Sequence, residues 1–125
     1  MTETQHPEWL RPYVPAIESM VALFHPHLEA VVHDVHHDRV VAIWNSHSRR
    51  RVGDPSLLDE LPPTNGAPVV VGPYERVSVD GKSITSVTSA LVDHEGTRRG
   101  LLCLNFDRSP FLNVATIMQK LATPV

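Results

Sequence analysis

The chain has 125 residues, a formal net charge of −3 and one cysteine. Its length suits one globular domain, and its acidic balance argues against a nucleic acid as direct partner, because phosphate binding needs a basic face. A single cysteine excludes an intramolecular disulfide and is typical of a reducing, cytoplasmic compartment. With no signal-peptide pattern and no apolar run near the ~20 residues of a membrane span, we expect no membrane contact.

The first part of the chain predicts a helix followed by a β-hairpin. Residues 1–11 are mostly polar, and we expect them to be flexible. Between 13 and 24 the apolar residues recur at helical spacing on one face. Pro15 is tolerated there because a nitrogen in the first turn needs no helical partner. Two segments rich in β-branched residues, 28–35 and 39–46, flank a turn of histidines and aspartate, which predicts a hairpin.

The middle of the chain is irregular and leads to a second hairpin. Only residues 54–61 predict a short helix, with Asp54 as its N-cap. Strands are then expected at 74–79 and 82–92. The Asp80-Gly81 pair between them predicts a type I′ turn.

The chain ends with one more strand and a closing helix. Residues 97–107 form an apolar strand that nevertheless contains Cys103 and Asn105. Residues 111–122 carry an apolar helical face after a Ser-Pro start. The whole order predicts an α+β domain, a five-stranded antiparallel sheet with helices packed on one face.

Three stretches of sequence stand out together: AIESMVALFHPHLEAVVHDV, IWNSHSRRRVGDP and, most specifically, SVTSALVDHEGTRRGLLCLNFD. They resemble the YheO-like (DauR-type) PAS domain family over residues 12–122, which leaves 123–125 as a C-terminal tail. The resemblance implies a PAS fold with flanking N- and C-terminal helices, whose sheet curves around a small cavity closed by short helices. Between Asn45 and Pro55 the chain is shorter than the family pattern.

The resemblance also implies a function. Family members resemble cytoplasmic transcriptional regulators in which this unit is the sensor and a C-terminal helix-turn-helix binds DNA. This chain ends at Val125 without a helix-turn-helix, so we expect a free-standing sensor for a small, amino-acid-like metabolite. Its terminal helices, 13–24 and 111–122, are apolar enough to form a homodimer and to transmit the signal.

Polar residues alternate along the predicted central strands. Cys103 and Asn105 share one face of the last strand, and Ser86 and Thr88 share one face of its expected neighbour. Buried polar groups need partners, so this face meets a ligand, meets water, or forms an internal network or a partner interface. The predicted ligand-binding residues are His33, Asn45, Arg51, Ser86, Thr88, Cys103 and Asn105.

Two of these residues have specific expectations. Arg51, just before the predicted short helix, is placed to clamp a ligand carboxylate, with solvent exposure as the alternative. Cys103 is interpreted as a small packing residue, because a nucleophilic thiol needs an adjacent base and a reachable, electropositive setting.

Residues 25–38 hold five histidines and two aspartates, which are metal-ligating residue types. A hairpin turn separates neighbouring side chains, so exposed turn histidines are the favoured interpretation and no metal site is assigned. The sequence does not identify a cofactor. Some PAS domains carry haem on a histidine, and here His25, His33 and His47 are the candidates for a haem or metal.

Three functions therefore follow from the sequence. The leading hypothesis is the metabolite sensor. The alternative is a small haem- or metal-dependent enzyme built on a PAS fold. The third is a regulatory subunit that docks through its sheet without any ligand.

Overall fold

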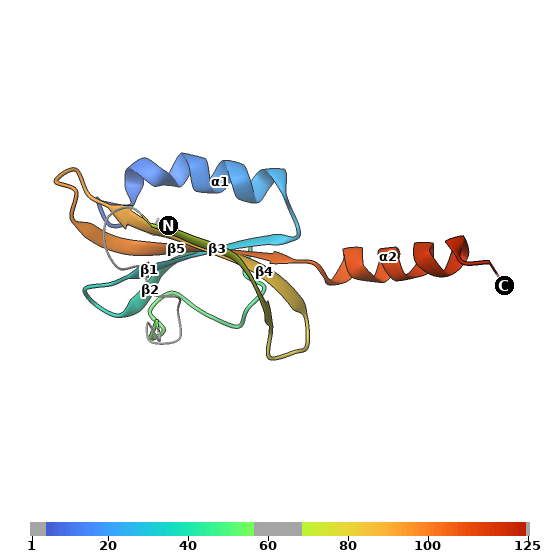
Figure 1. The fold of residues 1–125 in the computed structure, drawn as a ribbon. Coiled ribbons are helices and arrows are strands. Elements are labelled where there is room, and N and C mark those ends of the chain that lie inside the picture. The colour runs from blue at the N-terminus through green and yellow to red at the C-terminus, as the bar shows by residue number, and fades with distance from the viewer. Residues whose placement is uncertain (1–4, 57–68, 125) are drawn as a thin grey trace.

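A computed structural model describes residues 5–56 and 69–124. In chain order its elements are the 3-10 helix η1 Arg11–Tyr13, α1 Val14–Leu23, β1 Leu28–Asp34, β2 Arg39–Trp44, β3 Val70–Val77, β4 Ser83–Val92, β5 Arg98–Asp107 and α2 Ser109–Ala122. The strands form one antiparallel sheet in the order β2-β1-β5-β4-β3 (Figure 1). The predicted α+β class is confirmed, and so is the prediction that the last strand is central.

Helix α1 covers one face of the sheet (Figure 1). Pro15 lies in its first turn, and Ile17 and Val21 point into the core. The residues buried together on this side are Trp9, Leu10, Ile17, Val21, Leu28, Ala30, Val32, Ala42, Leu91 and Leu102. All are apolar, so this face supplies the hydrophobic core of the domain.

Part of the N-terminal segment packs against the domain. Trp9 and Leu10, which fall within the segment expected to be flexible, are both buried. The indole of Trp9 lies over Gly100 of β5, where an added Cβ would come within 2.4 Å of the ring. A glycine is therefore needed at this point of the sheet, and the packed part of the chain includes residues before 12.

The turn between β3 and β4 differs from the predicted type I′. That turn needs positive φ at both central residues, but of the pair only Gly81 has it, at +84°. The backbone N–H of Ser78 donates to Lys82 O at 2.9 Å, and Gly81 N donates to Ser78 O at 2.9 Å. These bonds close a three-residue loop with glycine in its left-handed position.

The middle of the chain shows two further differences. Strand β3 begins at Val70, earlier than the predicted 74, and includes a Gly-Pro pair at a register irregularity. Proline is tolerated because β3 is an edge strand. Most of the predicted helix at 54–61 lies outside the described residues. At its start, Pro55 instead forms a single bridge with Arg39 of β2.

Helix α2 leaves the sheet and projects away from the domain (Figure 1). None of its described residues is buried. It is attached at its base, where the ring of Phe111 stacks on Phe106 with centroids 5.6 Å apart and meets the His27 ring at 4.8 Å. A closing helix is present as predicted, but among the described helices α1 alone packs on the sheet.

Candidate functional site

The face of the sheet opposite α1 carries a group of buried polar side chains beside a small apolar cluster of Val31, Val40 and Cys103. We call this surface the polar face, and it consists of Glu29, His33, Ser86, Thr88, Cys103 and Asn105, all buried. The strand register brings these side chains together, because Ser86 pairs with Asn105 and Thr88 with Cys103. The predicted shared face of β4 and β5 is therefore confirmed. The segment after β2 crosses this side, below the sheet in Figure 1.

A buried carboxylate organises one half of the polar face. Glu29 is 1% exposed, and its Oε1 accepts a hydrogen bond from Asn105 Nδ2 at 2.9 Å. Its Oε2 accepts from His47 N at 2.7 Å, from Ser48 N at 2.8 Å and from Ser48 Oγ at 2.9 Å. Burial raises the pKa of Glu29, but these hydrogen bonds outweigh burial and leave the pKa below its ordinary value. The carboxylate is therefore ionised and holds the segment after β2 against the sheet.

A chain of hydrogen bonds runs from this carboxylate across the sheet. Asn105 Oδ1 accepts from Ser86 Oγ at 2.7 Å, and Ser86 Oγ accepts from Arg76 Nε at 3.1 Å. Donation thus proceeds in one direction, from the Arg76 cation through Ser86 and Asn105 to Glu29. For Ser86 and Asn105, the structure shows the internal network that the sequence left as an alternative.

The other half of the polar face is more loosely connected. Thr88 Oγ1 lies 2.9 Å from Tyr74 Oη and 3.5 Å from Cys103 Sγ. Burial raises the pKa of Cys103, against smaller lowering effects that include Thr88, Arg50 and Arg76. The thiol stays protonated and packs with neighbouring valines, which agrees with its interpretation as a packing residue.

His33 is a buried, neutral imidazole with one free nitrogen. Burial, followed by the charge of Arg50, lowers the pKa of His33 to about 4. Its Nε2 lies 3.4 Å from Arg50 Nη1, and because a guanidinium only donates, Nε2 is the acceptor and Nδ1 carries the proton. Within the described residues, that Nδ1 is buried without a hydrogen-bond partner, as is Ser56 Oγ on the segment that crosses this face.

The YheO-like PAS domain matches residues 3–123. The chain belongs to the YheO-like PAS family. Over 124 residues it is 34% identical to the "Transcriptional regulator DauR" of Pseudomonas aeruginosa. The match covers 99% of this chain and 59% of that relative, so the chain spans less than two thirds of the relative's length. No solved structure matches it.

These comparisons confirm the predicted family. A PAS domain related to a transcriptional regulator supports a role as a sensor domain. Within residues 5–56 and 69–124, no helix combines the length and the apolar character needed to cross a membrane.

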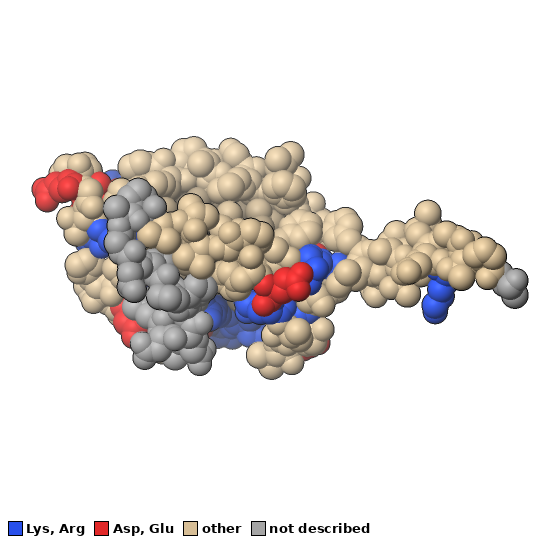
Figure 2. All heavy atoms as spheres, viewed as in Figure 1, with Lys and Arg blue, Asp and Glu red and all other residues tan. Residues whose placement is uncertain are grey.

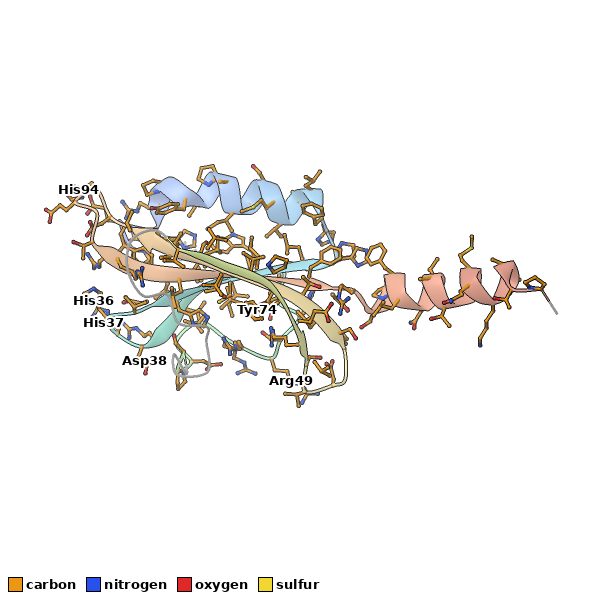
Figure 3. All side chains as sticks on the ribbon, viewed as in Figure 1. His36, His37, Asp38, Arg49, Tyr74 and His94 are labelled. Carbon is orange, nitrogen blue, oxygen red and sulfur yellow. The ribbon has the colours of Figure 1, made fainter. Side chains whose placement is uncertain are left out.

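Two of the predicted ligand-binding residues lie away from the polar face of this PAS domain. Asn45 ends β2 in the left-handed conformation, with φ of 51°, and its Nδ2 donates to Pro26 O and Leu28 O at 3.0 and 2.9 Å. Arg51 is exposed, and its backbone N–H donates to Asp54 Oδ2. The arginine that reaches the polar face is Arg50, while Arg49 lies exposed at the outer side of the segment (Figure 3).

The candidate haem or metal histidines do not converge. His25 is exposed, His47 Nε2 lies 2.8 Å from Pro26 O, and His33 Nε2 faces Arg50. His36 and His37 lie at the tip of the β1–β2 hairpin, exposed as predicted (Figure 3). In the described part of the chain, no group of three or more His, Cys, Asp or Glu residues could hold a metal ion. The residues present therefore do not fit a shared haem or metal site.

Sequence reasoning missed four residues of the polar face or its border: Glu29, Arg50, Tyr74 and Arg76. A signal existed for Glu29, because a charged residue inside an apolar, β-branched strand must find a buried partner. No signal existed for Arg50, Tyr74 and Arg76, which reach the polar face only in the folded chain.

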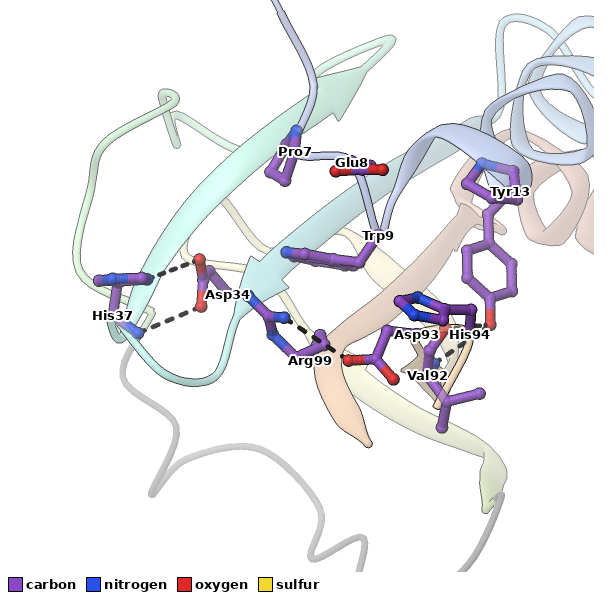
Figure 4. Close-up of a pocket in the computed structure, with 11 residues that line it drawn as sticks. Pro7, Glu8, Trp9, Tyr13, Asp34, His37, Val92, Asp93, His94 and Arg99 are labelled. Atoms are coloured by element: carbon purple, nitrogen blue, oxygen red, sulfur yellow. Dashed lines mark hydrogen bonds and ion pairs between the residues drawn. The ribbon is translucent and has the colours of Figure 1, made fainter. Parts of the chain in front are cut away.

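A hollow of about 880 Å³ lies beside Trp9 (Figure 4). Two of its acidic side chains have partners: Asp34 Oδ2 lies 2.8 Å from His37 Nδ1, and Asp93 pairs with Arg99 at 3.6 Å. Tyr13 Oη donates to Val92 O at 2.8 Å across the same hollow. These contacts tie the N-terminal segment and two hairpin ends together, which is a structural role.

Proposed function

We propose that this PAS domain is a cytoplasmic metabolite sensor whose polar face binds a small, amino-acid-like molecule. The observation that carries the proposal is a buried face with an ionised carboxylate at one side and the His33 imidazole at the other, whose Nδ1 has no partner within the described residues. Ser56 Oγ, on the segment after β2, is likewise buried and unpartnered there. Buried polar groups without partners are rare in folded proteins and cost about 1–3 kcal/mol each. A ligand that supplies the missing partners offsets that cost.

The segment after β2 connects the ligand to the rest of the domain. Glu29 holds Ser48 by two hydrogen bonds, and Arg50 follows two residues later against His33. A ligand that engages Arg50 or His33 would therefore move the same segment that Glu29 holds. This movement would pass to β5 through Asn105, which contacts Glu29 directly.

Strand β5 leads from the polar face into α2, which makes α2 the expected output element. Asn105 lies on β5, and two residues later Asp107 Oδ1 accepts a hydrogen bond from Ser109 N at the start of α2. Arg108 N also donates to Ser83 O of β4 at 2.9 Å. A change in the polar face can thus alter the direction in which α2 leaves the sheet.

We also propose that α2 forms a homodimer with a second copy of this chain. Phe111, Val114, Met118 and Leu121 are exposed and follow the alternating three- and four-residue spacing of a coiled-coil seam. Lys120 is the one charged side chain of the helix, so little repulsion opposes pairing. At the base of α2, the stacked rings of Phe106 and Phe111 extend this apolar surface toward α1, where Phe24 is 47% exposed. Both terminal helices therefore contribute apolar surface.

The dimer is tested by sedimentation over a range of concentrations. Met118→Glu should give a monomer, because it places a charge in the seam, whereas Gln119→Glu, outside the seam, should leave the dimer intact. A monomeric wild-type chain, or a dimer that survives Met118→Glu, would show that α2 does not mediate self-association.

Ligand binding is tested by thermal shift and then calorimetry with the common amino acids and their 2-oxo acids. Thr88→Val should weaken binding of any compound found by about 3- to 10-fold, because it removes one hydroxyl from the polar face. Thr85→Val is the matched control, since Thr85 points from the same strand to the α1 side. If no compound binds, or if both variants weaken binding equally, the proposed site is wrong.

A further inference from the structure

Two guanidinium groups approach the polar face from opposite edges of the sheet. Arg50 lies on the segment after β2 and contacts His33, whereas Arg76 lies on β3 and donates to Ser86. Strands β2 and β3 are the two edges of the sheet, with β5 between them. Within the described ranges, neither guanidinium is within ion-pair distance of a carboxylate. Figure 2 shows basic side chains gathering on this side, while the surface of α1 is nearly free of charge.

Both cations act on the same buried centre. Arg50 and Arg76 each lower the pKa of the Cys103 thiol through their charge, against the larger effect of burial. The strand register places their contacts on either side of Cys103, because His33 pairs with Leu101 and Ser86 pairs with Asn105. An anion bound beside Cys103 would therefore be attracted by both guanidinium groups.

The groups native to the polar face do not supply that anion. Glu29 is its one carboxylate, and its oxygens already accept four hydrogen bonds from Asn105, His47 and Ser48. His33 is neutral, and among residues 5–56 and 69–124 its Nδ1–H has no acceptor; the Ser56 hydroxyl, also without a partner there, can donate or accept a hydrogen bond. The polar face thus has two nearby cations and one carboxylate, and both unpartnered groups are able to donate.

We infer that the polar face recognises the carboxylate of its ligand, held between Arg50 and Arg76 with the free donors of His33 and Ser56 beside it. The inference rests on the proposed function and specifies which part of an amino-acid-like ligand is bound. Guanidinium groups suit this task because their planar donors match the two oxygens of a carboxylate. Arg50 would take the role that the sequence suggested for Arg51.

The test compares each amino acid found to bind the intact chain with its carboxamide, which has the same side chain and no negative charge. By calorimetry the carboxamide should bind the wild-type chain at least about tenfold more weakly, the size expected for losing a charged hydrogen bond. Arg50→Met and Arg76→Met should each weaken binding of the free acid by about 10- to 100-fold. Arg49→Met and Arg51→Met are matched controls in the same arginine run and should bind normally.

The outcomes separate the two proposals. If amino acids bind but their carboxamides bind equally well, the carboxylate inference is wrong and the sensor proposal stands. If Arg50→Met and Arg76→Met keep their melting temperature and also keep full affinity, the inference is again wrong. If no amino acid or 2-oxo acid binds the wild-type chain, the proposed function fails first. The comparison of acid and carboxamide on the wild-type chain needs no variant, so it holds even where a substitution prevents folding.

Discussion

The two faces of this sheet are built from the same strands but differ in chemistry. On the α1 side the buried residues are apolar, among them Val32 and Leu102. On the other side the alternate positions of the same strands carry Glu29, His33 and Asn105, equally buried. Because successive side chains along a strand point to opposite faces, the same strands can form an apolar face and a polar face.

The difference shows how stability and recognition are separated in this domain. The apolar face gains free energy by removing carbon surface from water, and it needs no particular partner. The polar face is favourable only while each buried group has a hydrogen-bond partner. The proposed ligand would therefore act on the polar face and not on the apolar face.

The largest effect is expected from breaking the polar network at its centre. Glu29→Ala leaves donors from Asn105, His47 and Ser48 without an acceptor and should lower the free energy of unfolding by about 3–5 kcal/mol. Glu75→Ala is the control: Glu75 is exposed and pairs with Arg108 at 3.2 Å, so about 0–1 kcal/mol is expected. Urea unfolding measures both. A loss for Glu29→Ala as small as that for Glu75→Ala would mean that the polar face contributes little to stability.

The alternation of the strands was predictable from sequence because it depends on local periodicity. The shared face of Thr88 and Cys103 follows from counting along two strands, and the pairing confirms it. The central position of the last strand also followed, from the resemblance as much as from the residues. The start of β3 did not, because a Gly-Pro pair usually marks a turn, and only an edge position lets the strand continue through it.

The connections of the site were less predictable because they join distant parts of the chain. Glu29 and Asn105 are 76 positions apart, and their hydrogen bond exists only once β1 and β5 pair. The choice between Arg50 and Arg51 depends on the path of the segment after β2, which no periodicity fixes. Local patterns therefore identified the polar face, and tertiary contacts decided which charges reach it.

The next effect is a dependence of stability on pH that arises from the polar face. The pKa of His33 is about 4 in the folded chain against 6.5 as its ordinary value, so between these values the unfolded chain binds a proton that the folded chain excludes. Stability is thus complete above pH 6.5 and falls as the pH is lowered toward 4, by on the order of 3 kcal/mol. The lowered pKa of Glu29 adds a loss of the same sign below about pH 4.5.

Unfolding by urea between pH 7.5 and 4.5 tests this, with His33→Gln as the non-titrating variant. Between pH 6.5 and 4.5, where the carboxylates contribute least, the free energy of unfolding of this variant should depend much less on pH than that of the wild-type chain. His36→Gln, at the exposed hairpin turn, should keep the wild-type dependence. An unchanged slope in His33→Gln would mean that the imidazole is protonated as readily in the folded chain as in the unfolded one.

The smallest effect tests whether the two faces are independent. Ile17→Val on α1 removes one methylene from the apolar core and should lower the free energy of unfolding by about 0.5–1.5 kcal/mol without changing ligand affinity. Thr88→Val keeps its side-chain volume and should mainly change ligand affinity. Because the two side chains lie on opposite faces, the stability effects in the double variant should add to within about 0.5 kcal/mol. A larger coupling energy from urea unfolding would mean that the sheet passes strain from one face to the other, and the core would then take part in sensing.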